Sequence, residues 1–484
     1  MTHVVTAFLR HRGEVLLVQR SDAIGTYQGK WGGVSGYVEG GSPGPIHDSG
    51  DSERSPPTLD SDDSGWPPST LDSGDSEWSP PTLTDARREL AEEVGVHEAT
   101  LVRAGDAVEV DDEQGQFTVH PFLFDLPADD RPDLDTNEEI ASTEWVQPPG
   151  ILARETVPAL WAAYEAVAPT VDDVRTDETH GSAAVSLRAL EVLRDRAAAA
   201  TERGDDWEAV AEVARDLRDA RPGMAALATR VNRVMAEADR TPEAVLDRAM
   251  RAVDDAVDAD DAAADNAADL LRAEGVERVC TLSRSGTVLD ALRSARPAVL
   301  VAESRTAREG VDVAEELARE GLDVTLTTDA AAGFACSADV GVDSSVAPEA
   351  LLVGADTVLA DGSVVNKVGT RALALAAARE GVPVYVAAAR DKVAPEGAED
   401  GGADGARDAD AGADPGIVPG QEFGPDAAIY EGDADLDVWN PVFDRTPGDL
   451  VSGVVTEDGV LDGDDVAAVA ADHAELARWN ERVG

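Results

Sequence analysis

Three glutamates on one short segment are the first residues whose spacing could support chemistry. Glu89, Glu92 and Glu93 stand at positions i, i+3 and i+4, so a helix would place their carboxylates on one face. Like charges repel one another there, and a divalent cation that prefers oxygen ligands, Mg²⁺ or Mn²⁺, would remove that cost. The alternative is an ordinary solvated acidic face, which is common in a chain this acidic.

A second set of polar residues follows a series of apolar, strand-like segments. In an open parallel sheet, ligands bind beyond the carboxyl ends of the strands. Hydroxyls, arginines, a lysine and a helix N-terminus at such ends could hold a phosphate, although the same residues also cap helices and line turns. The residues at these ends are Ser283-Arg284-Ser285-Gly286, Glu303-Ser304-Arg305, Thr328-Asp329, Gly354-Ala355-Asp356 and, before a helix, Asn366-Lys367.

The glutamates lie in a segment that reads as a mixed α/β domain. Val4 to Arg20 alternates and then runs apolar, which predicts a hairpin that turns at Arg12-Gly13. The glutamate helix spans residues 84–95, with Thr84 or Asp85 near its N-cap and Gly95 near its C-cap. Further strands are predicted at residues 118–124 and 142–146, and a short helix at residues 157–167.

The second half of the chain predicts a helical part followed by a parallel sheet. Residues 182–273 are helical by their Ala/Leu/Arg periodicity. Mostly apolar strands joined by helical crossovers then indicate a Rossmann-like, doubly wound sheet. The predicted strands are residues 276–283, 298–304, 323–328, 351–359 and 382–388, and the predicted helices are residues 287–294, 311–320 and 370–380.

We therefore expect two α/β modules joined by a linker. Residues 48–83 hold three tandem copies of a 12-residue unit rich in Pro, Ser and Asp, which predicts a disordered, repeat-containing insertion. The predicted boundaries are residues 1–167 for the first domain with the insertion at 43–83, 168–178 for the linker, 179–275 for the helical part, and 276–484 for the Rossmann-like part with a mobile loop at 396–420.

Composition restricts the compartment and the partners. The chain has 97 acidic and 40 basic residues, and only Lys30, Lys367 and Lys392 of the basic residues are lysines. Because periodic apolar segments argue against disorder, we interpret the net charge of −57 as adaptation to molar salt, where the Debye length is roughly 3 Å. Such a surface repels phosphate backbones, so direct nucleic acid binding is not expected. Without a membrane-length apolar run or a signal-peptide pattern, we expect a cytoplasmic protein that does not bind membranes.

The segment from Arg88 to Val96 resembles the second half of the Nudix box, REUxEExGU, at every specified position. Residues 31–42 resemble its first half, with Gly36 as the leading glycine, and the resemblance covers roughly residues 1–165. It departs from the box at Ser42, where a glutamate is expected, and the repeats lengthen the spacer.

The Nudix resemblance implies an α/β/α sandwich with a mixed sheet that hydrolyses a nucleoside diphosphate derivative. Glu89, Glu92 and Glu93 would be catalytic ligands of Mg²⁺ or Mn²⁺, Arg88 would hold them electrostatically, and Gly36 would contact the substrate.

The motifs SRSGTV, AESR, GADTVLADGSVVNKVGT, VPVYVAA and NPVFDRTP together resemble the initiation factor 2B alpha, beta and delta subunits. That family also contains methylthioribose-1-phosphate and ribose-1,5-bisphosphate isomerases, and the resemblance spans about residues 179–457. It implies a homodimer or higher homo-oligomer that binds a phosphorylated sugar or nucleotide. The residues implied to bind it are Ser283, Arg284, Arg305, Asp356, Asn366 and Lys367.

One position argues against isomerase activity. The isomerases use a cysteine at the end of the first strand, where this chain has Ser283. Cys280, three residues earlier, is expected to be a core residue, and a hydroxyl replaces a thiol poorly. We therefore expect a magnesium-dependent Nudix-type hydrolase fused to a regulatory, initiation factor 2B-like module. Two alternatives stay open, a sugar-phosphate aldose–ketose isomerase and a non-catalytic regulatory binding protein.

Overall fold

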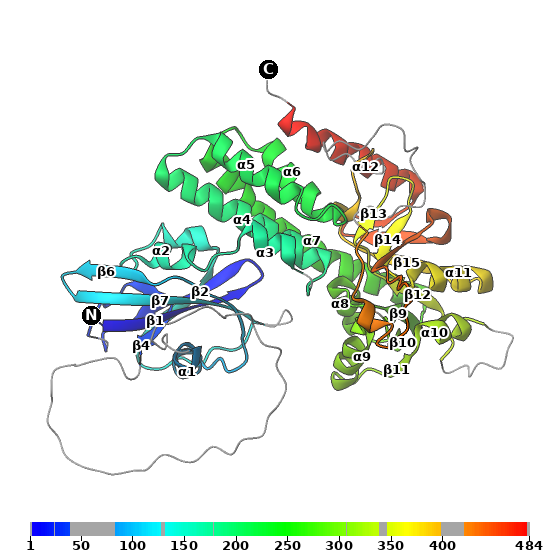
Figure 1. Ribbon diagram of the computed structural model, residues 1–484, viewed down its shortest axis with the longest axis horizontal. Helices are drawn as coiled ribbons and strands as arrows, with labels where there is room; N and C mark the ends of the chain where they lie inside the picture. Colours follow the sequence, from blue (N-terminus) through cyan, green and yellow to red (C-terminus); the bar gives the residue numbers. More distant parts are fainter. Residues whose placement is uncertain are drawn as a thin grey trace, which may run out of the picture. The chain divides into compact units, whose positions relative to one another are not determined.

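The computed structural model describes residues 2–23, 25–38, 83–126, 131–177, 179–305, 307–337, 346–397 and 421–481. The chain divides into two compact units, Met1–Ala168 and Pro169–Gly484 (Figure 1). The predicted insertion at residues 43–83 lies outside the described residues except for Leu83, and the predicted loop at residues 396–420 lies outside them except for residues 396 and 397. None of the helices in the described ranges is both long and apolar enough to cross a membrane.

The first unit is built on a mixed sheet of eight strands within the described residues. β1 pairs in parallel with β7 and antiparallel with β2 and β4. The β1–β2 hairpin turns at Arg12 (φ 46°) and Gly13 (φ 84°), as the sequence predicts for a tight turn with two left-handed residues. The strands are β1 (Thr2–His11), β2 (Glu14–Arg20), β3 (Trp31–Gly32), β4 (Val34–Tyr37), β5 (Thr100–Ala104), β6 (Val108–Asp112), β7 (Gly115–Asp125) and β8 (Ile140–Val146).

Alternating residues of β1 supply two cores on opposite faces of this sheet. Val5 and Leu9 pack with Leu90 of α1 (Leu83–Val94). Phe8 points to the other face and packs with Tyr164 of α2 (Leu160–Glu165). The period-two alternation of a strand therefore fixes which helix covers which face.

The second unit begins with helices that pack against one another through small side chains. Alanine, valine and leucine from α4 to α7 form one core, which keeps the helices close despite the low aromatic content. Two boundaries follow from local residue preferences: Gly204 ends α4 with φ 71°, and Pro242 is the first residue of α7. The helices are α3 (Val171–Thr176), α4 (Ser182–Arg203), α5 (Trp207–Arg218), α6 (Ala225–Glu237) and α7 (Pro242–Glu274).

A seven-stranded sheet follows with the order β11-β10-β9-β12-β15-β17-β18. All neighbours in it are parallel except β17 and β18. The chain winds outward from β9 in one direction and from β12 in the other, so the topological switch point lies between these two strands. The strands are β9 (Arg278–Leu282), β10 (Ala298–Ala302), β11 (Val324–Thr327), β12 (Ala350–Val353), β15 (Val384–Ala387), β17 (Gly453–Thr456) and β18 (Gly459–Leu461).

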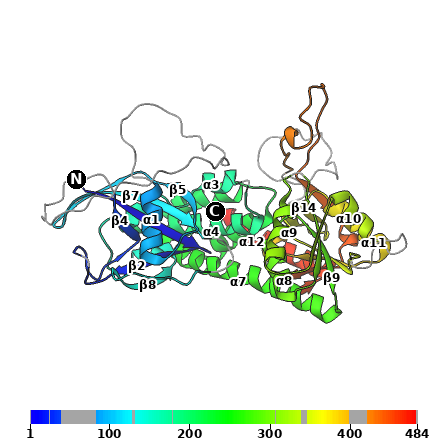
Figure 2. The ribbon, with the colours of Figure 1, turned by 90° about the horizontal axis from the view of Figure 1, so that it is seen from below.

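Helices cover both faces of this sheet, as Figures 1 and 2 show. One core joins the sheet to α7, α8 and α9, and the other joins it to α10, α11 and α12. A mixed α/β architecture with a parallel sheet is therefore observed, and each strand expected in this part of the chain is present. The helices are α8 (Gly286–Ala295), α9 (Glu309–Arg319), α10 (Asp329–Ala335), α11 (Thr370–Glu380) and α12 (Gly463–Ala477).

A small antiparallel sheet of β13 (Thr357–Val358), β14 (Val364–Lys367) and β16 (Phe443–Thr446) was not expected from the sequence. It begins directly after the carboxyl end of β12 and carries Lys367 at the end of β14. These strands have two to four residues each, too few for an alternating pattern to be recognised in the sequence.

Candidate functional site

Two strained serines mark the carboxyl ends of β9 and β10. Ser283 and Ser304 have φ values of 63° and 56°, a left-handed conformation that is unfavourable for residues other than glycine. The backbone N–H of Ser283 donates to Ser304 Oγ, and the N–H groups of Ser304 and Arg305 donate to the Asp329 carboxylate at 2.8 and 2.7 Å. These hydrogen bonds hold both turns beside the switch point of the sheet.

Glu309 connects this turn to the small sheet. Its carboxylate accepts a hydrogen bond from the Ser283 hydroxyl, and its other oxygen lies 3.0 Å from Lys367 Nζ. Lys367 also lies over the Phe443 ring, with Nζ 5.5 Å from the centroid. The first residue of α9 thus joins a strand end to a lysine that is far away in sequence.

Asp356 lies just beyond the carboxyl end of β12, on the other side of the switch point. Its N–H donates to the Val365 carbonyl at 3.0 Å, which fixes the backbone. Burial raises the pKa of Asp356, and the charges of Lys392 and Lys367 and a hydrogen bond from Ser182 oppose that rise. Ser182 is the first residue of α4, so the helical part contributes directly to this site.

Lys392 reaches the same site from the segment after β15. It ends the short helical turn Arg390–Lys392 and is 4% exposed. Burial lowers the pKa of Lys392, and the carboxylates of Asp260 and Asp356 oppose that effect. The chain has three lysines, and the charges of two of them act on one aspartate.

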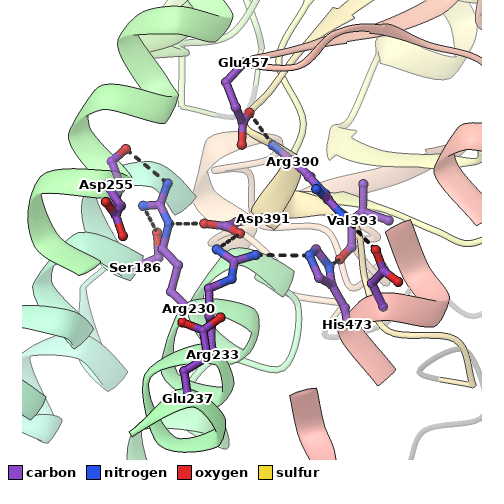
Figure 3. A network of polar contacts seen from close by, with 12 residues as sticks. Ser186, Arg230, Arg233, Glu237, Asp255, Arg390, Asp391, Val393, Glu457 and His473 are labelled. Atoms are coloured by element: carbon purple, nitrogen blue, oxygen red, sulfur yellow. Dashed lines mark hydrogen bonds and ion pairs between the residues drawn. The ribbon is translucent and has the colours of Figure 1, made fainter. Parts of the chain in front are cut away.

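A buried ionic network holds the Lys392 segment, as Figure 3 shows. Arg230 Nε and Arg233 Nη1 of α6 lie 3.1 and 2.6 Å from the Asp391 carboxylate. His473 of α12 donates from Nδ1 to the Val393 carbonyl at 2.8 Å and accepts from Arg233 at 3.3 Å. The residues on either side of Lys392 are thus fixed to two different helices.

A cavity of about 380 Å³ lies beside this network. Arg230, Arg233 and Arg248 line it together with Asp391 and several other acidic residues. Each of the three guanidinium groups already has a carboxylate partner, so the cavity offers no unbalanced positive charge to an anion.

The structure brings some of the predicted binding residues together and separates others. Ser283 and Lys367 both contact Glu309, and the charges of Lys367 and Glu309 act on Asp356 without a direct contact. Arg284 instead pairs with Glu316 at 2.7 Å, and the Arg305 side chain is exposed.

The remaining predicted residue, Asn366, contacts the first residue of α11. Its Nδ2 donates to Thr370 Oγ1 at 3.0 Å. The N-terminus of α11 was expected to help hold a phosphate, but the Asp444 carboxylate accepts from the N–H groups of Gly369 and Arg371 at 2.8 and 3.1 Å. This end of the helix is therefore already capped by an anion.

Lys392, Glu309 and Ser182 were missed from the sequence. The rarity of lysine was the signal for Lys392, because a chain that otherwise uses arginine keeps lysine at very few positions. Glu309 and Ser182 gave no such signal among so many acidic and small residues.

In the first unit, Gly36 lies against the glutamate helix. A Cβ atom at Gly36 would come within 1.9 Å of the Glu89 carboxylate, so any other residue would displace this side chain from the β4 backbone. Glu89 and Glu93 are buried, and Glu93 accepts from the Ser35 N–H at 3.3 Å. Burial, together with the charge of Glu89, raises the pKa of Glu93 to about 8.

The three predicted metal ligands do not converge. Arg88 pairs with Glu89 at 2.8 Å and with Glu92 at 3.0 Å, and Glu92 is 59% exposed. Among the residues that the structure describes, no group of three or more His, Cys, Asp or Glu side chains could hold a metal ion. Binding of Mg²⁺ or Mn²⁺ here stays a prediction from the sequence.

The two cysteines are free and buried among apolar side chains. Burial raises the pKa of Cys280, so its thiol is protonated at neutral pH. Cys280 is thus a core residue, as expected, and does not replace the cysteine that is absent at Ser283.

Comparisons with known proteins concern the second unit. The sequence model of the "Initiation factor 2 subunit family" matches residues 178–463. A probable bifunctional methylthioribose-1-phosphate isomerase/methylthioribulose-1-phosphate dehydratase of Nocardia farcinica is 33% identical, over 64% of this chain and 56% of its own. A methylthioribose-1-phosphate isomerase of Desulforudis audaxviator is 30% identical, over 64% of this chain and 89% of its own. Against the first two such relatives, this chain spans about half of their length.

Solved structures give a weaker likeness. The translation initiation factor eIF-2B of Pyrococcus horikoshii is 24% identical with a TM-score of 0.46, over 60% of this chain and 94% of its own. The 5-methylthioribose 1-phosphate isomerase of the same organism is 19% identical with a TM-score of 0.46, over 70% and 90%.

These findings correct the expected activity. The sequence relatives are named isomerases, so the prediction of a hydrolase, with isomerisation argued against, is wrong. The first unit is a different module from the matched family, and nothing found here supports its assignment as a Nudix domain. The hydrolase prediction depended on three glutamates at helical spacing that match a short motif, and in the structure Arg88 pairs with two of them.

Proposed function

Because the chain belongs to the initiation factor 2 subunit family, we propose that residues 178–463 bind a sugar 1-phosphate and convert this aldose to the ketose. The names of the relatives support this class of reaction. The observation that carries the proposal is Asp356, a carboxyl at the switch point of the sheet on which the charges of Lys367 and Lys392 act.

The reaction requires two groups that exchange protons. When the furanose ring of a sugar 1-phosphate opens, the ring oxygen takes up a proton. The hydrogen on C2 moves to C1 with its electron pair, and the O2 hydroxyl loses a proton as the ketone forms. A positioned base and a positioned acid each contribute about 10²–10⁴-fold to such proton transfers.

Asp356 is the base in this proposal. Burial raises its pKa toward the operating range, while the lysines keep its ionised form accessible. Lys367, which pairs with Glu309 at 3.0 Å, would exchange this partner for the phosphate, and Ser283 and Ser182 supply hydroxyls for the sugar. The closed, partly buried position strengthens each of these interactions relative to water.

A direct test incubates the full chain in molar KCl with methylthioribose 1-phosphate or ribose 1,5-bisphosphate and separates aldose from ketose over time. We expect ketose with the wild type and a decrease in kcat of at least ~100-fold in Asp356→Asn. Asp361→Asn, which removes an exposed carboxylate that pairs with Arg445, should leave the rate within about twofold. Failure of the wild type to form ketose from either sugar would refute the proposal.

A second candidate is a binding protein that does not turn its ligand over. It is favoured by Ser283, whose hydroxyl bonds to Glu309 where the isomerases carry a thiol. This alternative predicts saturable binding of the sugar phosphate, measured by calorimetry, together with no ketose. We also propose that the protein forms a homo-oligomer and has a regulatory role related to translation initiation. Measuring the binding of the sugar phosphate would test neither of these two properties.

A further inference from the structure

Lys392 is a largely buried lysine, with 4% of the residue exposed. The carboxylates of Asp260 and Asp356 act on its charge from a distance, and none of the ion pairs within the described residues includes its Nζ. Removing a charge from water without pairing it is costly, so lysines are rarely left in this state. A structural role would be expected to come with a partner, as it does for each of the buried arginines nearby.

The groups around Lys392 come from three directions. Val358 and Val393 form a parallel bridge, and the Ala394 N–H donates to the Val358 carbonyl at 2.8 Å, so the segment that carries Asp356 lies beside the segment that carries Lys392. The charges of Asp260 on α7 and Arg230 on α6 also act on the amine. Asp260 Oδ1 is itself buried without a hydrogen bond, while its other oxygen lies 3.2 Å from Arg230. The two carboxylates favour the protonated amine, and burial and the Arg230 charge favour the neutral one.

The choice of lysine at this position is informative. Only three of the 40 basic residues in the chain are lysines, so arginine is the usual cation here. Arginine cannot give up its proton in a protein, whereas a buried lysine can. A position that needs only a fixed positive charge would be served by arginine, as positions 230 and 233 are.

We propose that Lys392 is the general acid of the isomerisation and acts opposite Asp356. This inference rests on the function proposed above and assigns the second of the two proton-exchanging groups. The Lys392 ammonium gives its proton to the ring oxygen as the bond from C1 to that oxygen breaks. The Asp356 carboxylate takes the O2 proton as the hydrogen on C2 moves to C1. The proton then passes from Asp356 to Lys392, so the product is an isomer and the enzyme is restored.

The ionic network of Figure 3 is the positioning device for this acid. Asp391 is held by Arg230 and Arg233, and the Val393 carbonyl is held by His473. The backbone on both sides of Lys392 is therefore fixed, and the bridge between Val393 and Val358 holds it beside the segment that carries Asp356. The short segment after β15 thus brings a catalytic group to a site built by other strands.

The test compares Lys392→Met, Lys392→Arg and Lys30→Met in the full chain. Lys392→Met removes the acid, and Lys392→Arg keeps the charge but cannot release a proton. We expect both to lower kcat at least ~100-fold with the sugar 1-phosphates. We also expect Lys392→Met to raise Tm, because it replaces an unpaired buried amine by an apolar chain of similar length. Lys30→Met, in the other unit, should change neither quantity.

Some outcomes would refute only the role of Lys392, and one would also refute the proposed isomerase function. Ketose formed by the wild type and at a similar rate by Lys392→Met would refute the inference alone. Activity retained in Lys392→Arg but lost in Lys392→Met would show a fixed charge and refute general acid catalysis. A lower Tm in Lys392→Met, with inactivity, would indicate a structural lysine and also refute it. Absence of ketose with the wild type would refute both proposals.

Discussion

Individual ionisable groups in both units have pKa values that depend on where the fold buries them. Glu93 shows the effect clearly, since burial beside Glu89 raises its pKa to about 8. The ordinary value of 4.5 applies to the unfolded chain. Between these two values the folded protein holds a proton that the unfolded chain has released, so this group makes the folded state less stable as the pH rises from about 4.5 to 8.

Replacement of Glu93 by glutamine should therefore stabilise the first unit at pH 8. Glutamine keeps the shape but has no proton to lose, so we expect a gain in the free energy of unfolding of at least about 1 kcal/mol at pH 8, which disappears near pH 4. Urea unfolding of the full chain, followed by tryptophan fluorescence in molar KCl, measures it. Glu92→Gln, at an exposed position, should change stability by less than about 0.5 kcal/mol.

A loss of stability in Glu93→Gln at pH 8 would contradict this account of the buried carboxyl. Repeating the titration with Mg²⁺ tests the cation site predicted from the sequence. A bound cation would favour the ionised glutamate and turn the gain into a loss.

At the scale of elements, the second unit depends on buried charges that hold helices to strand ends. Asp391 joins α6 to the segment after β15 through two arginines, and Arg230 is 2% exposed. The two arginines and the His473 side chain hold the pKa of Asp391 below its ordinary value against the effect of burial. The carboxylate is therefore ionised in the folded state.

Removing this carboxylate should be strongly destabilising. Asp391→Ala leaves Arg230 buried beside Asp260 alone, so we expect the free energy of unfolding to fall by about 3–5 kcal/mol. Asp458→Ala is the control, because Asp458 is 55% exposed where it pairs with Arg390, and it should cost less than about 1 kcal/mol. Equal small losses in the two variants, measured by urea unfolding, would mean that the buried network does not hold the segment.

The elements of the parallel sheet were predictable because each carries its own pattern. An apolar run such as residues 298–304 between two amphipathic helices indicates a buried parallel strand without reference to the rest of the fold. The position of Asp356 at a strand end followed from the same reasoning. The contact between Glu309, Ser283 and Lys367 did not, because it arises only when β14 folds back over the switch point.

The acidic helix shows which features of a site could not be predicted from the sequence. Its helical state and the shared face of Glu89 and Glu93 could be read from spacing. Spacing could not show that Arg88 would pair with Glu92 and draw it toward solvent. Whether carboxylates converge on one point depends on the orientation of side chains and on the packing partner, which here is Gly36.

For the whole molecule, we expect the net charge of −57 to make the stability of the fold depend on salt. Self-repulsion between acidic residues weakens as salt shortens the Debye length from ~10 Å at 0.1 M to ~3 Å at 1 M. We expect Tm to rise steadily with KCl over this range, measured by circular dichroism. A Tm that is unchanged or falls with salt would contradict the interpretation of the charge as salt adaptation.

The central claim is that the second unit isomerises a sugar 1-phosphate through Asp356. Carbon NMR of the full chain in molar KCl, with methylthioribose 1-phosphate and ribose 1,5-bisphosphate each labelled at C2, observes the changing atom itself. The account predicts that the labelled carbon of at least one sugar moves from the alcohol region to the ketone region with the wild type and stays in place with Asp356→Asn. A carbon that remains an alcohol in both sugars with the wild type, or becomes a ketone equally fast with Asp356→Asn, would contradict it.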